Sequence, residues 1–322
     1  MKIETTLKAL KAQDWRVLAK TMTMVESQRS DHRLFSWDLM KKILCDAQLF
    51  HHSKVIGISG PPGVGKSSFL EAFVPQLLEK GLKVAILSID PSSQMSGGSI
   101  LGDKTRMTQL AAHPHCFIRP SPAGAKLGGI SSKTREMILL CRYFAFDYIF
   151  VETVGVGQSE VEVAQVVDYL AMLISPGAGD DLQGIKKGIL ENIHLLIVHK
   201  ADADKKVQTQ TTCHHYQESL KVLNVNSVPV LAASSLEKTG LVEVLNTLEQ
   251  YFANYEWSAA SQFEFVQNWL KIALEEQFLQ QFRQNQALQK QLATQAQSLL
   301  NGKLDWPDLY NSCLQEMKLS TK

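Results

Sequence analysis

The sequence has no excess of charge of either sign. Its 322 residues include 33 Lys and Arg against 32 Asp and Glu, which gives a formal net charge of +1. Proteins that bind nucleic acid or anionic membranes usually show a basic imbalance, because phosphate groups attract Lys and Arg. We therefore expect neither nucleic acid nor a membrane among the partners of this protein.

Paired cysteines and long apolar runs are also missing. The five cysteines are scattered and form no C-x-x-C pair, which indicates free thiols in a reducing compartment. No apolar signal segment opens the chain, and no apolar run reaches the length needed to span a bilayer. These absences predict a cytoplasmic protein, and the length allows one large or two modest domains.

The most informative feature that is present is a glycine-rich octapeptide. It fits the phosphate-binding loop G-x-x-x-x-G-K-[ST] at each of its positions, which are Gly60, Pro61, Pro62, Gly63, Val64, Gly65, Lys66 and Ser67. An apolar run precedes the loop and a helical pattern from Ser68 follows it, as the motif requires. The backbone N–H groups of such a loop surround a phosphate chain. Lys66 would then reach the terminal phosphates, and the Ser67 hydroxyl would bind Mg²⁺.

Apolar strands alternate with helical segments between residues 54 and 250. This alternation predicts an α/β fold with a doubly wound, mainly parallel sheet, whose ligands bind beyond the carboxyl ends of the strands. The strands that we expect are 55–58, 84–89, 116–118, 148–152, 169–174, 195–198 and 228–231.

Helical spacing without strands flanks this region on both sides. We expect an N-terminal helical segment over 1–45, the α/β domain over 46–256 and a C-terminal helical arm over 257–322. The helical period of the arm runs over 263–288, and the stretch 277–297 is rich in glutamine. A helix this polar buries little against its own domain. A solvated helix or a loose tail is one interpretation; we favour an arm that packs on a second subunit.

Two of the predicted strands end in an acidic residue on the side of the phosphate loop. Asp90 ends one strand and Glu152 ends another, and an acid placed there can hold Mg²⁺ directly or through water. Gly155 follows Glu152 by three residues, as in the D-x-x-G element of GTPases, where the glycine N–H meets the γ-phosphate. Gln158 is placed to orient an attacking water, and a purely structural glutamine is an equal alternative.

The base site is expected at His199, Lys200, Ala201 and Asp202. GTPases carry N-K-x-D here, in which the Asp accepts from guanine N1–H and N2–H₂ and the lysine stem lies along the base. Lys200 and Asp202 therefore predict guanine. His199 replaces an Asn that would bridge to the phosphate loop and donate to guanine N7, so we expect selectivity to survive with reduced affinity. The last base-contacting loop is expected at Ser234, Ser235 and Leu236.

These elements together resemble the MeaB/ArgK family of GTPases, which are chaperones of adenosylcobalamin-dependent acyl-CoA mutases. The resemblance covers nearly the whole chain, and its most specific stretches are 102–107 and 152–160. The other segments that carry it are 60–68, 89–93, 97–107 and 176–202. Three places depart from the family pattern, namely His199 for Asn, Ser235 for Ala, and Ser132-Lys133 for a pair of small residues.

The resemblance implies a GTP hydrolase with GTP/GDP and Mg²⁺ as its ligands. The metal would be surrounded by Ser67, Asp90, Asp103 and Glu152. The segments 97–107, 153–165 and 176–189 would act as switches, the last with Lys186 on the phosphate side. The C-terminal arm would build a homodimer. The partner would be an adenosylcobalamin-dependent acyl-CoA mutase, with methylmalonyl-CoA mutase as the expected one, whose cofactor loading the protein would gate and which it would protect.

Three alternatives to this function stay open. A nucleotide-dependent kinase linked to lysine, arginine and ornithine transport would use ATP, against which Asp202 argues. A metallochaperone GTPase would carry a His-rich or Cys-rich motif, whereas this chain has only Cys213-His214-His215, which is better interpreted as a polar surface cluster. A nucleotide-binding regulator that has lost hydrolysis is the third.

Overall fold

The structure is a computed structural model of the chain. It describes residues 2–27, 29–46, 48–50, 52–90, 107–122, 132–153, 163–177, 190–222 and 227–301, together with 307, 309–311 and 313, and it leaves out the side chains of Asp90, Ser121 and Pro122. The chain divides into two compact units, Met1–Phe265 and Val266–Lys322. The domain boundaries expected near residues 45 and 256 stay a prediction.

The first unit is built on one seven-stranded sheet, in which every neighbouring pair of strands is parallel. The strand order is β3-β2-β4-β1-β5-β6-β7. The strands are β1 (Lys54–Ser59), β2 (Val84–Asp90), β3 (Cys116–Pro122), β4 (Tyr148–Glu152), β5 (Tyr169–Ile174), β6 (Leu195–His199) and β7 (Val230–Ala233). The predicted doubly wound, parallel α/β fold is confirmed.

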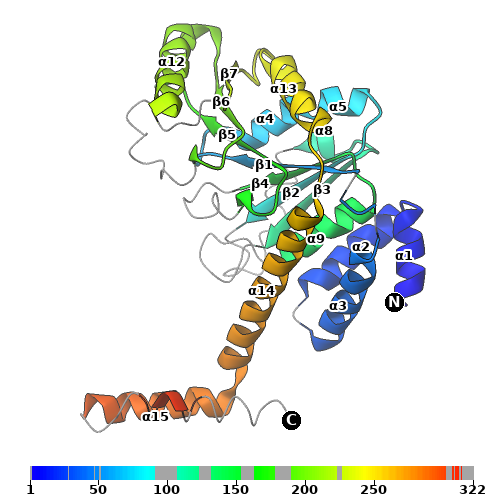
Figure 1. Ribbon diagram of the computed structural model, residues 1–322, viewed down its shortest axis with the longest axis vertical. Coiled ribbons are helices and arrows are strands. Elements are labelled where there is room, and N and C mark those ends of the chain that lie inside the picture. The colour runs from blue at the N-terminus through cyan, green and yellow to red at the C-terminus, as the bar shows by residue number, and fades with distance from the viewer. Residues whose placement is uncertain are drawn as a thin grey trace. The chain divides into compact units, whose positions relative to one another are not determined.

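Helices cover both faces of this sheet (Figure 1). Because helices cover both faces, the central strands β4, β5 and β6 are buried along their whole length, and their sequences are nearly continuous apolar runs rather than alternating ones. The helices that follow the phosphate loop are α4 (Lys66–Phe73), α5 (Pro75–Glu79), α8 (Thr108–Ala111), α9 (Ser132–Tyr143), α12 (Lys206–Val222) and α13 (Leu241–Ala253), with a 3₁₀ turn, η3 (Ala203–Lys205).

Strand β7 begins two residues later than the sequence suggested. Pro229 has no N–H to give to a strand ladder. Its carbonyl still accepts from the N–H of Leu196 over 3.0 Å, but regular pairing with β6 starts at Val230.

Three helices precede the sheet, namely α1 (Ile3–Lys11), α2 (Trp15–Glu26) and α3 (Ser30–Leu44). The Asp14 carboxylate caps α2 by accepting from two backbone N–H groups of its first turn. Trp15 packs edge-on against Phe144 and Phe146, with ring centroids 5.2 and 5.4 Å away. This aromatic contact holds α2 beside α9 (Figure 1).

A buried ion pair ties together the end of the sheet that lies away from the phosphate loop. Arg142 Nη2 donates to Asp168 Oδ1 over 2.7 Å, and both side chains are fully buried. The same carboxylate accepts from the backbone N–H of Val55 over 2.8 Å and from Trp257 Nε1 over 2.9 Å. We call these four residues the Asp168 anchor. It joins α9, the start of β1, the residue before β5 and the segment before α14.

The last two helices are α14 (Ala259–Gln284), which begins in the first unit, and α15 (Gln286–Leu300) in the second. The single helical period expected through Leu288 is broken at Asn285, whose side chain accepts from the N–H of Leu288 and caps α15.

On α14, Leu270, Leu274 and Phe278 are each about half exposed. In the described part of the chain, none of the helices combines the length and the apolar character needed to cross a bilayer.

Candidate nucleotide-binding site

The phosphate loop connects the carboxyl end of β1 to the first residue of α4, as its motif predicts. Gly60 has a φ of 137°, and a Cβ built on it would lie 2.2 Å from the carbonyl oxygen of Leu173 in β5. Only glycine can therefore hold this turn against the neighbouring strand. Gly65, with a φ of 99°, is the N-cap of α4, so the loop ends at the N-terminus of a helix, where backbone N–H groups can bind phosphate.

Lys66 is buried and its ammonium lies across the loop. Its Nζ donates to the carbonyl oxygens of Gly60, over 2.6 Å, and Pro61, over 3.0 Å. A positive charge is thus fixed within the ring of backbone that the motif assigns to phosphate.

Three oxygen-bearing side chains meet beside the loop. Ser67 Oγ donates to Glu152 Oε1 over 2.6 Å, and Ser88 Oγ donates to Glu152 Oε2 over 3.2 Å. The residues come from α4, β2 and the end of β4, and β2 and β4 pair with Ser88 opposite Glu152. A carboxylate and a hydroxyl are oxygen donors of the kind that Mg²⁺ prefers, so this group fits the metal that the sequence predicts.

Ser88 is a member of this group that the sequence reasoning missed. Its signal was a polar residue inside an otherwise apolar strand, two positions before the acidic residue that ends the strand. Asp90 ends β2 as expected, at the same edge of the sheet as Glu152.

The residues expected to read the base form a second cluster. Ser234 Oγ donates to Asp202 Oδ1 over 2.6 Å, and Lys205 Nζ lies 3.3 Å from Asp202 Oδ2. The hydrogen bond from Ser234 is the main reason why the pKa of Asp202 is lowered, so this side chain is a carboxylate that only accepts. Lys200, at a positive φ of 61°, donates from Nζ to the carbonyl oxygen of Gly63 over 2.6 Å.

The loop after β7 is held in shape by the backbone of Ser234. Its N–H and C=O bond reciprocally with those of Thr239 over 3.0 and 3.2 Å. The Ser234 hydroxyl accepts from the N–H of Glu237 over 3.0 Å, so its own proton is left to donate to Asp202. Leu236 is 82% exposed and lines the pocket beside Asp202.

His199 joins the base cluster to the phosphate loop. Its side chain is buried, with Nδ1 2.8 Å from the carbonyl oxygen of Val64 and Nε2 2.7 Å from Ser235 Oγ. Burial is the main reason why the pKa of His199 is lowered, which favours the neutral imidazole. The bridge to the phosphate loop that an Asn was expected to make is therefore made by a histidine.

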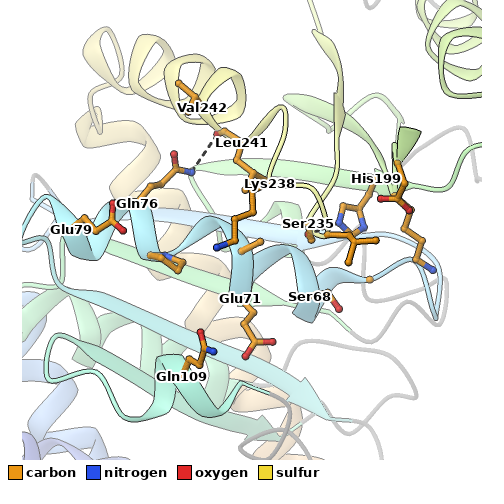
Figure 2. A pocket seen from close by; sticks show the side chains of 16 residues that line it. Ser68, Glu71, Gln76, Glu79, Gln109, His199, Ser235, Lys238, Leu241 and Val242 are labelled. Atoms are coloured by element: carbon orange, nitrogen blue, oxygen red, sulfur yellow. Dashed lines mark hydrogen bonds between the residues drawn. The ribbon is translucent and has the colours of Figure 1, made fainter. Parts of the chain in front are cut away.

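Two adjoining pockets hold these clusters. A pocket of about 770 Å³ is lined by His199, Asp202, Ser235 and Leu236 and continues along α4 and α5, as Figure 2 shows. A pocket of about 640 Å³ is lined by Pro62, Lys66, Ser67, Ser88 and Glu152. The residues common to both linings are Gly65, Ser68, Glu71 and Lys200. A ligand with a base at one end and phosphates at the other fits this pair.

Four of the predicted site residues, Asp103, Gly155, Gln158 and Lys186, lie outside the described residues. Most of the three predicted switch segments lies outside them as well. The described residues bring together the phosphate loop, Glu152 and the base cluster.

Comparisons with known proteins agree with this geometry. A family model described as "Methylmalonyl Co-A mutase-associated GTPase MeaB" matches residues 18–287. The chain is 43% identical over 249 residues to GTPase ArgK of Escherichia coli, which covers 76% of this chain and 74% of that protein. It is 36% identical over 302 residues to the "Methylmalonic aciduria type A homolog, mitochondrial" of Mus musculus, with 89% and 72% covered.

Two solved structures share the fold of this chain. A structure titled "Crystal structure of LAO/AO transport system kinase" superposes with a TM-score of 0.71 at 29% identity and covers 98% of this chain and 97% of that chain. HypB from Helicobacter pylori in complex with nickel, at 16% identity and a TM-score of 0.52, covers 71% of this chain and 99% of its own and shows the fold alone. From the family match and the site, this chain belongs to the MeaB family of P-loop GTPases, and is a GTP hydrolase that binds guanine nucleotides.

Proposed function

We propose that this GTPase is a chaperone of an adenosylcobalamin-dependent acyl-CoA mutase, that it gates loading of the cofactor, and that it protects the mutase. The observation that carries the proposal is the match over residues 18–287 to a family described as associated with methylmalonyl-CoA mutase. Methylmalonyl-CoA mutase is accordingly the partner we expect. The mouse relative named for methylmalonic aciduria supports the same partner.

In this proposal the phosphate loop, Gly60–Ser68, binds the phosphates of GTP, and Gly155 meets the γ-phosphate. Lys200, Asp202, Ser234, Ser235 and Leu236 surround the guanine. Two neighbouring pockets support this assignment, because Gly65, Ser68, Glu71 and Lys200 line both of them.

We further propose that Ser67, Asp90, Asp103 and Glu152 hold Mg²⁺, which neutralises phosphate charge when bound. The hydrogen bond from Ser67 to Glu152 supports the assignment of these two oxygens to one centre. Lys66 and Lys186 would add positive charge around the terminal phosphates, and Gln158 would orient the attacking water.

The C-terminal arm, 257–322, is proposed to join two copies of the chain in a cytoplasmic homodimer. The row Leu270, Leu274 and Phe278 supports an apolar contact along α14, because residues four apart lie on one side of a helix. Alanine substitution of this row should lower the dimer mass seen by light scattering, and an unchanged mass would argue against the arm.

The proposal is tested by mixing the protein with purified methylmalonyl-CoA mutase and Mg²⁺ in GTP, GDP or ATP. We expect a complex on size-exclusion chromatography whose stability differs between GTP and GDP, and a change in GTP turnover when the mutase is added. The absence of both would contradict the chaperone role. Asp202→Asn, with the exposed Asp204→Asn as its matched control, should lose the response to GTP.

The structure titled as a transport system kinase favours one competing function, which is an ATP-dependent kinase. Asp202 argues against it, since adenine offers no N1–H and no 2-amino group to a carboxylate. Stronger binding of ATP than of GTP in the same assay would support the kinase.

A further inference from the structure

Both ring nitrogens of His199 are used inside the protein. A carbonyl oxygen can only accept, so Nδ1, 2.8 Å from the carbonyl oxygen of Val64, carries the ring's proton. In the neutral imidazole, Nε2 is then an acceptor, and the Ser235 hydroxyl donates to it over 2.7 Å. The ring therefore has no N–H left to offer a ligand.

The ring is also fixed in place. A Cβ built on Gly65 would lie 2.8 Å from His199 Cε1, so the imidazole fills the space that the missing side chain of this glycine leaves open. The ring also packs edge-to-face with Phe69, with centroids 5.9 Å apart at an interplanar angle of 87°. The side chain cannot turn toward the base without leaving both hydrogen bonds and this packing.

The pairing with Ser235 has a structural origin. Strands β6 and β7 place His199 opposite Ala233, so Ser235 comes two residues after the strand position that faces the histidine. These are two of the places at which the chain departs from the GTPase pattern, and they contact each other (Figure 2). The serine supplies the proton that Nε2 needs, a role that an alanine could not fill.

We propose that this GTPase recognises guanine without a hydrogen bond to N7, because His199 and Ser235 are hydrogen-bonded to each other and to the phosphate loop instead of to the base. The inference rests on guanine-nucleotide binding at the proposed base site and specifies how that site reads its ligand. The selectivity for guanine over adenine then comes from Asp202, whose carboxylate accepts from the N1–H and 2-amino donors of guanine. The His199–Ser235 pair positions the loop around the base and does not read it.

The test compares three nucleotides on the full-length protein by equilibrium binding. In 7-deaza-GTP a C–H replaces N7, and in inosine triphosphate the 2-amino group is missing. We expect 7-deaza-GTP to bind within about twofold of GTP, and inosine triphosphate to bind roughly tenfold more weakly, the equivalent of one lost hydrogen bond to a charged group. A roughly tenfold loss with 7-deaza-GTP would overturn the inference.

Variants sharpen the result. His199→Asn combined with Ser235→Ala restores a side-chain N–H and should create a preference for GTP over 7-deaza-GTP of roughly fivefold to tenfold. The control His214→Asn, at an exposed position, should leave the ratio of the GTP and 7-deaza-GTP affinities unchanged. Ser235→Ala alone should also leave the ratio near one, because the only ring proton still faces Val64. If the wild type binds GTP clearly more tightly than 7-deaza-GTP, the present inference is wrong while guanine binding at this site stands. If the wild type does not bind GTP, guanine binding at this site is wrong as well.

Discussion

The hydroxyl of Ser67 donates to the carboxylate of Glu152 over 2.6 Å, which links the first turn of α4 to the end of β4. We predict that Glu152→Gln lowers the affinity for the Mg²⁺ that supports GTP turnover, because an amide offers one oxygen without charge to a metal centre. The Mg²⁺ concentration for half-maximal turnover should rise roughly 10–100-fold, the usual effect of disturbing a metal environment. Glu71→Gln, in the same pocket, is the control. An equal rise in both variants would contradict the role of Glu152.

Asp202→Asn should change the preferred base from guanine to xanthine. The Ser234 hydroxyl is fixed as a donor, so it should bind the amide oxygen and leave the amide N–H₂ at the position of Asp202 Oδ2, while the partly exposed Lys205 ammonium turns away into solvent. That group repels the guanine 2-amino group but can donate to the oxygen that xanthine carries there. We expect a loss of GTP affinity of roughly 10–100-fold, as for a hydrogen bond to a charged group. Competition between GTP and xanthosine triphosphate measures the change.

Two glycines of the phosphate loop should differ in their tolerance of alanine. Both have positive φ, 76° at Gly63 and 99° at Gly65, which costs roughly 1–2 kcal/mol in an L-residue. A Cβ at Gly63 meets nothing within 4 Å, whereas a Cβ at Gly65 lies 2.8 Å from the His199 ring. Gly65→Ala should therefore lower the free energy of unfolding by about 1–3 kcal/mol more than Gly63→Ala. Equal losses of unfolding free energy in the two variants, measured by chemical denaturation, would show that the His199 ring moves aside at no cost.

The Asp168 anchor predicts a large cost for losing Arg142. In Arg142→Met the carboxylate of Asp168 stays buried without its cation, which typically costs 3–5 kcal/mol, so about that loss is expected. The exposed pair between Lys80 and Glu249, at 2.8 Å, is the matched control, and Lys80→Met should cost about 0–1 kcal/mol. Urea denaturation of both variants checks the difference, and a loss below about 1 kcal/mol for Arg142→Met would contradict it.

Acidification should destabilise the protein partly through His199 and His194. Burial lowers the pKa of each below its ordinary value of 6.5, so the unfolded chain binds more protons than the folded one in this range. Their contribution to stability is present above pH 6.5 and is lost as the pH falls from 6.5 toward the lowered values. Between pH 7.5 and 5.5, His199→Gln should therefore lose less stability than the wild type. A steeper loss in the variant would contradict the neutral imidazole.

Much of this architecture could be predicted from local sequence. The phosphate loop and the apolar strands are encoded by consecutive residues, because a buried parallel strand needs an unbroken apolar run. The placement of Glu152 beside Ser67 followed from the same reasoning, since both lie at the carboxyl edge of the sheet.

Contacts between distant residues were the part that sequence could not give. His199 was expected to alter the base site, but its partner Ser235 lies 36 residues away and is set by the register of β6 and β7. The Asp168 anchor was not predicted for a similar reason, because one aspartate between predicted elements gives no sign of an arginine 26 residues earlier. The break at Asn285 is local, and an N-cap residue was its signal.

The Asp168 anchor also limits how far the chain can be shortened from its C-terminus without a loss of stability. A protein shortened to end at Tyr255 would keep the described residues of the phosphate loop and of the base cluster, yet it would lack the Trp257 N–H. One oxygen of a carboxylate that is fully buried in the intact chain would then lose one of its two donors. The smallest independently stable nucleotide-binding fragment should therefore extend past α13 to Trp257. The first residue of the C-terminal arm thus belongs to the folding unit of the GTPase domain.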